Sequence, residues 1–87
     1  MHAVVARVRI DDQEASDREL RERVVPGVSQ APGFVAGYWT RKDDTGLSMV
    51  IFESEDAANA MGERLPSVVP ETVTLESDEV REVAAHA

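Results

Sequence analysis

The sequence contains no cysteine, which removes two ways of stabilising a chain of 87 residues. Disulfide bonds and thiolate metal sites are both excluded. A domain of this size buries only about 60–65% of the surface that its unfolded chain exposes, so a monomer without cross-links, metal or a partner is only marginally stable. The absence of cysteine therefore favours stabilisation by a partner chain.

Long apolar runs are also missing. No segment approaches the roughly 18 consecutive apolar residues that a membrane-spanning helix needs. Residues 1–7 enter a strand-like pattern directly, without the basic region, apolar region and cleavage site of a secretory signal peptide. We therefore expect a cytoplasmic protein with no membrane partner.

Positively charged residues are few, with 9 Lys and Arg against 17 Asp and Glu, and the formal net charge is −8. This charge opposes a phosphate backbone, so nucleic acid is not expected as a partner. The acidic residues are interspersed with arginines and concentrate at the expected helix starts and at the chain ends. We interpret them as a solvated surface, with docking of a basic partner as the alternative.

Hydrophobic periodicity predicts the first strand and the first helix. Apolar residues occupy every second position of the strand: Val4, Ala6, Val8 and Ile10. A spacing of four then predicts an amphipathic helix, at Leu20, Val24 and Val28. The helix starts either near Asp11 or at Ser16, and we favour the earlier position. Pro26 predicts a kink or a restart within it.

A breaker at residues 31–33 separates this helix from two further strands. Residues 34–41 are aromatic and β-favouring, which predicts the second strand. Turn residues at 42–46 lead into a third strand at 47–52, so the two strands form a hairpin. The third strand is apolar at nearly every position, which is typical of a central strand covered on both faces.

A second helix follows the hairpin. Ser54 can cap its start, and Pro66 is expected to end it. Its buried stripe is expected at Ala57, Met61 and Leu65.

A fourth strand at residues 72–75 and 80–84 completes the pattern, with a bulge or turn at 77–78 where the apolar positions change parity. The order strand, helix, hairpin, helix, strand is that of a ferredoxin-like βαββαβ domain with a four-stranded antiparallel sheet. We therefore predict a single α+β domain over residues 1–87.

Two helices can cover only one face of such a sheet, and the other face is too apolar for water. The third strand carries Val50 and Phe52 on one face. Its other face carries Leu47, Met49 and Ile51. Burial of each such side chain contributes about 1.5–3 kcal/mol, which is large beside the ~5 kcal/mol net stability of a small domain. We therefore predict a homodimer through the sheet face, with a different partner chain or an open ligand groove as alternatives.

Three segments carry a family resemblance. They are Ala-Pro-Gly-Phe-Val-Ala-Gly-Tyr at 31–38, the hairpin, and Val-Ile-Phe-Glu-Ser-Glu-Asp-Ala-Ala at 50–58. The Pro-Gly-Phe start of the second strand and the Phe-Glu-Ser start of the second helix resemble the antibiotic biosynthesis monooxygenase-like family of the dimeric α+β barrel superfamily. With the first and fourth strands, the similarity spans nearly the whole chain.

The resemblance implies a homodimeric barrel with its helices outside and a ligand pocket between each sheet and its own helices. Characterised members include oxygenases that oxidise aromatic polyketides without metal or flavin, haem-degrading enzymes and quinol oxygenases. This chain lacks the strand-one Asn and the helical Trp and His of the haem-degrading branch. The implied function is cofactor-independent oxidation of a small aromatic or quinone-type metabolite. The alternative is a non-catalytic homodimeric module that binds a small ligand or serves as an accessory protein.

The candidate ligand-binding residues are Tyr38, Trp39, Arg7, Asn59 and Met61. Related cofactor-free oxygenases use Asn, Trp, Tyr and Arg to bind a phenol-like substrate, although the match here is by residue type and not by position. Tyr38 and Trp39 are neighbours on a strand, so they point to opposite faces and one is expected at the dimer interface. Arg7 either holds an anionic ligand or pairs with a glutamate across the dimer. Asn59 and Met61 have surface and core positions as their alternatives.

The two histidines lie near opposite ends of the chain, which the ferredoxin-like order brings together. His2 and His86 would supply two imidazoles without a third ligand, which falls short of ordinary zinc coordination. We therefore predict no metal site. No glycine-rich phosphate loop, Ser-His-Asp order or paired-carboxylate motif is present, and no catalytic residue is assigned.

Overall fold

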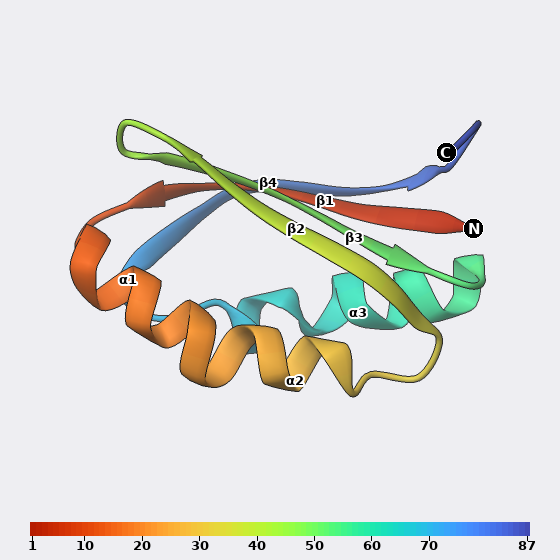
Figure 1. Ribbon diagram of the computed structural model, residues 1–87, viewed down its shortest axis with the longest axis horizontal. Helices are drawn as coiled ribbons and strands as arrows, with labels where there is room; N and C mark the ends of the chain where they lie inside the picture. The colour runs from red at the N-terminus through yellow and green to blue at the C-terminus, as the bar shows by residue number, and fades with distance from the viewer.

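The computed structural model describes residues 1–87 as an α+β domain, with a four-stranded antiparallel sheet and helices on one of its faces (Figure 1). The strands are β1 (His2–Ile10), β2 (Phe34–Lys42), β3 (Thr45–Phe52) and β4 (Val73–Glu82). The helical segments are α1 (Gln13–Glu19), the π-helical turn η1 (Leu20–Val24), α2 (Val25–Ser29) and α3 (Glu55–Val68). The predicted order of elements is confirmed, and it is compatible with a ferredoxin-like fold.

The strand order in the sheet is β2-β3-β1-β4, so β1 and β3 are the central strands. Residues that lie opposite each other across an antiparallel pair share a face. Val4 lies opposite Val50 of β3 and Val80 of β4, and this row faces the helices. The apolar alternation predicted for the first strand therefore marks the covered face of the sheet.

The core lies between this covered face and the helices. Phe52 and Val4 are its most deeply buried large side chains, at 0% and 1% exposed. The ring of Phe34 packs edge-on against that of Phe52, with 6.3 Å between the ring centroids. The helices contribute Val24, Val28, Ala58 and Met61.

The first helix starts at the earlier of the two predicted positions. Asp12 is its N-cap, and the Ala15 N–H donates to the Asp12 carboxylate at 3.1 Å. The helical path then continues through Pro26 by way of η1, in which the Val25 N–H bonds to the Leu20 carbonyl. A proline ring crowds the carbonyl four residues earlier, so the widened turn accommodates Pro26 without breaking the helix.

The predicted end of the second helix is wrong. α3 runs to Val68 and contains Pro66. Because Pro66 lies in the last turn, its missing N–H removes only one helical hydrogen bond, and the helix continues past it. Of the predicted stripe, Met61 is buried, whereas Ala57 and Leu65 are half-buried.

The fourth strand is continuous over its whole length, and the predicted bulge is confirmed close to its expected position. Arg7 pairs with Ser77 and Val8 pairs with Leu75, so Glu76 is an extra residue in β4. A bulge of this kind changes which side chains of a strand face the core. It therefore accounts for the change of parity in the sequence.

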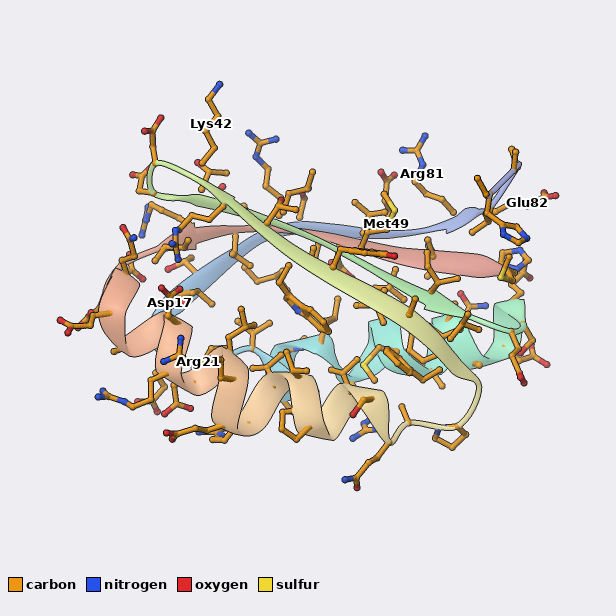
Figure 2. All side chains as sticks on the ribbon, in the orientation of Figure 1. Asp17, Arg21, Lys42, Met49, Arg81 and Glu82 are labelled. Atoms are coloured by element: carbon orange, nitrogen blue, oxygen red, sulfur yellow. The ribbon has the colours of Figure 1, made fainter.

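The face of the sheet away from the helices, here called the open face, carries large apolar side chains. Tyr38 lies opposite Met49 on this face, and Thr40 lies opposite Leu47. Tyr38 is 64% exposed, and Leu47 and Met49 are each 44% exposed. Figure 2 shows Met49 on the side of the sheet away from the helices, with Lys42 and Arg81.

Replacing Ser54 with alanine is expected to lower the free energy of unfolding by about 1 kcal/mol. The Ala57 N–H donates to the Ser54 hydroxyl at 3.1 Å and would lose this acceptor. Denaturant unfolding followed by circular dichroism measures the loss. Ser67→Ala is the control, because this exposed hydroxyl donates only to the Arg64 carbonyl within the same helix. An equal loss in both variants would contradict the assigned cap.

Candidate functional site

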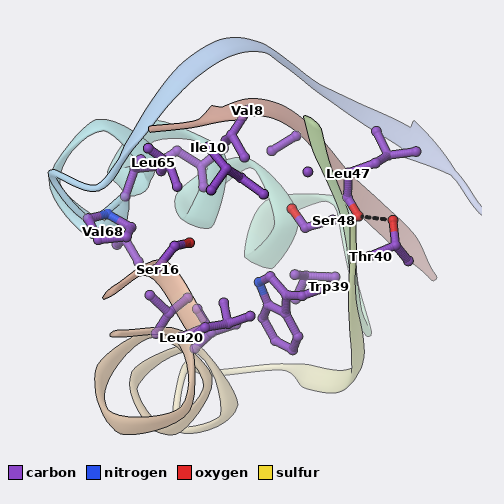
Figure 3. A pocket seen from close by; sticks show the side chains of 18 of the residues that line it. Val8, Ile10, Ser16, Leu20, Trp39, Thr40, Leu47, Ser48, Leu65 and Val68 are labelled. Atoms are coloured by element: carbon purple, nitrogen blue, oxygen red, sulfur yellow. Dashed lines mark hydrogen bonds between the residues drawn. The ribbon is translucent and has the colours of Figure 1, made fainter. Parts of the chain in front are cut away.

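An apolar cavity of about 130 Å³ lies between the covered face of the sheet and the helices (Figure 3). Hydrophobic residues make up 15 of the 22 residues that line it. Its volume is close to the roughly 150 Å³ of an engineered protein cavity that holds benzene. The cavity is therefore large enough for one aromatic ring.

The helix wall of the cavity is the stripe that the sequence predicted. Leu20, Val24 and Val28 all line it, and Leu20 and Val24 are the two ends of η1. Ser16 continues the same spacing of four residues and also lines the cavity. The π-helical turn thus forms part of the cavity wall, as such turns often do at functional sites.

The sheet wall includes positions with little or no side chain. Ala6 of β1 and Gly46 of β3 both line the cavity. A Cβ atom at position 46 would lie 2.8 Å from Cγ2 of Val8, which is too close for two carbon atoms. Glycine at this position therefore lets the Val8 side chain pack directly against β3.

Several polar side chains interrupt the mostly apolar lining, among them Ser16, Trp39 and Ser48. The indole of Trp39 projects into the space between β3 and the first helix, and the hydroxyls of Ser16 and Ser48 lie on either side of it in Figure 3. A hydroxyl both donates and accepts hydrogen bonds, whereas an indole N–H only donates. The lining can therefore hold a ring that carries oxygen atoms.

One ion pair is the only charged part of the lining. The Arg41 guanidinium at the end of β2 pairs with the Asp17 carboxylate of α1, which ties the helix to the edge of the sheet. The two side chains are 37% and 34% exposed, so they lie where the cavity meets solvent. A carboxylate and a guanidinium are thus available at the rim.

The structure brings together two of the candidate ligand-binding residues. Trp39 and Met61 both line the cavity. Tyr38 lies on the open face, as does the exposed Arg7, whose Nε is 3.9 Å from a carboxylate oxygen of Glu76. Asn59 is exposed on α3. The predicted opposition of Tyr38 and Trp39 is confirmed, and Trp39 is the one that faces the cavity.

The two histidines lie at neighbouring chain ends, where the Val83 N–H donates to the Met1 carbonyl at 3.0 Å. Nε2 of His2 is 3.2 Å from a carboxylate oxygen of Glu55 at the start of α3. His86 is exposed. No group of three or more His, Cys, Asp or Glu side chains is arranged to hold a metal ion.

The sequence matches no protein-family model and shows no significant match to a curated protein. None of the helices has the length and apolar character required to cross a membrane. The cavity and the open face are the two features from which a function can be inferred.

Proposed function

We propose that two copies of the chain pair through their open faces to form a dimeric α+β barrel, as the family resemblance implies. Exposed Tyr38, Leu47 and Met49 supply the apolar contact surface, and patches of this kind mark interaction surfaces. Lys42 and Glu79 lie on the same face, so it carries both signs of charge. A surface with both signs of charge can be complementary to its own copy, which supports a second copy as the partner.

Within each protomer, we infer that the cavity binds a small molecule with one aromatic ring. The cavity itself carries this inference, since its volume of about 130 Å³ suits a single ring and its lining is mostly apolar. Trp39 offers an aromatic surface for packing against the ring. Ser16 and Ser48 offer hydrogen bonds to ring oxygens, which favours a phenol or a quinone-type molecule over a hydrocarbon.

Cofactor-independent oxidation of this ligand is the reaction that the resemblance implies, and the rim of the cavity favours it. Asp17 is the one carboxylate of the lining and can accept a proton from a phenolic hydroxyl. Arg41 beside it can stabilise the resulting negative charge. In the reaction, one atom of O₂ enters the substrate and the other leaves as water, so the substrate supplies the electrons and no cofactor is needed.

The dimer is tested by sedimentation velocity at micromolar concentration, where we expect twice the 9.5 kDa mass of the chain. Met49→Lys places a charge within the apolar interface of both copies, and it is expected to weaken the dimer at least about tenfold. Ala60→Lys adds the same charge at an exposed position of α3, on the helix side of the molecule, and should leave the dimer intact. A species of 9.5 kDa for the unsubstituted protein would contradict the pairing.

Ligand binding is tested with phenol and hydroquinone as probes. Trp39 is the only tryptophan, so its emission should change saturably as a probe fills the cavity. Ser48→Leu places three additional carbon atoms and no hydroxyl in the cavity, and it is expected to weaken binding about tenfold or more. Ser67→Leu, at an exposed site on α3, is the matched control. Equal affinities in the two variants would place the probe outside this cavity.

Oxidation is tested by oxygen consumption with a panel of single-ring hydroquinones, without added metal or flavin. We expect uptake of one O₂ per substrate molecule. Asp17→Asn removes the proton acceptor and should lower the rate by about 10²-fold or more while probe binding persists. Glu22→Gln, on the exposed side of η1, is the control. Binding without oxygen uptake above the uncatalysed rate would refute the oxidation and favour the ligand-binding module.

A further inference from the structure

Gly37 and Trp39 occupy alternate positions of β2, so both face the helices. A Cβ atom at position 37 would lie 2.7 Å from Cη2 and 2.8 Å from Cζ3 of the Trp39 indole. Carbon atoms that are not bonded to each other pack at about 3.5–4.0 Å. The indole therefore occupies the space that any side chain at position 37 would need.

The backbone gives no other reason for glycine at this position. Gly33 is the only glycine with a positive φ angle, and Gly37 pairs with Val50 as an ordinary strand residue. Glycine inside a strand lowers stability and often marks a close approach by another group. At Gly37 the approaching group is the ring of Trp39.

A further contact limits the space around position 37. Cε2 of Phe34 lies 3.5 Å from the position of the missing Cβ, so that side of β2 is already filled. The indole, Leu20 and Ser48 all line the cavity. A side chain at position 37 would therefore displace the indole and change the shape of the cavity that it lines.

We propose that Gly37 is a positioning residue that holds the Trp39 indole against β2 and thereby sets the shape of the cavity. Its consequence for ligand affinity rests on the proposed function, because only a ligand in this cavity would sense the change. The position of the indole itself does not depend on any ligand.

The test compares Gly37→Ala with Gly27→Ala, in which the added Cβ has no atom within 4 Å. Gly37→Ala is expected to shift the emission of Trp39 in the protein without ligand. It should also lower the midpoint of thermal unfolding by about 4 °C or more, as overpacking does in a domain of this size. Gly27→Ala should leave the emission unchanged and the midpoint equal or higher, because alanine favours a helix over glycine.

A second pair of variants tests why Gly37→Ala lowers the unfolding midpoint. It distinguishes a clash with the indole from a general destabilisation of β2 by alanine. Phenylalanine lacks the Cη2 and Cζ3 atoms of the indole that approach position 37 most closely. Adding Gly37→Ala to a Trp39→Phe protein should therefore lower the midpoint less than adding it to the natural sequence. An equal loss in both backgrounds would overturn the proposal.

Measuring the affinity for phenol distinguishes a failure of this proposal from a failure of the proposed function. If phenol binds the natural protein, Gly37→Ala should weaken that binding about tenfold or more, which corresponds to about 1.4 kcal/mol. If phenol and hydroquinone do not bind but the emission and the midpoint change as stated, Gly37 positions Trp39 and the proposed function fails. If Gly37→Ala matches Gly27→Ala in both emission and midpoint, the positioning role is overturned whatever phenol does.

Discussion

Helices cover one face of the four-stranded sheet and leave the other uncovered, and both functional features depend on this arrangement. On the covered face, side chains fill only part of the space between the sheet and the helices, and the unfilled part is the cavity. On the open face, the same alternation of side chains brings Tyr38 and Met49 to the surface. Because neighbouring strand residues point to opposite faces, Trp39 contributes to the cavity and Tyr38 to the open face.

The order of the helices and strands could be predicted because the spacing of apolar residues differs between the two. The same spacing also indicates which side of each element is buried. The structure confirms both patterns: the alternating apolar residues of β1 and the residues spaced four apart in the first helix face the same cavity. The end of α3 could not be predicted in this way. Pro66 is a strong local signal, but its cost depends on how many helical hydrogen bonds remain beyond it. The bulge in β4 was detectable because one extra residue changes the parity of the apolar positions.

The candidate site could be predicted only in part, since its shape depends on contacts between distant segments. Parity placed Tyr38 and Trp39 on opposite faces, but it could not assign the faces because the pairing register shifts between Phe34 and Ala36. Ser16 could have been predicted as a lining residue, because it lies four residues before Leu20 and continues the helix stripe. The role of Gly37 could not be predicted from the sequence, because it depends on where the Trp39 ring lies in three dimensions.

The position of β1 at the centre of the sheet has a consequence for how the chain folds. Val4 pairs with Val50 and Val80, so the first strand of this domain receives both neighbours from the later half of the domain. Pairings between segments so distant in sequence form slowly, because the intervening chain must close first. During translation β1 therefore emerges with an apolar face and two unpaired edges. The nascent chain is most vulnerable to misassociation before β4 leaves the ribosome.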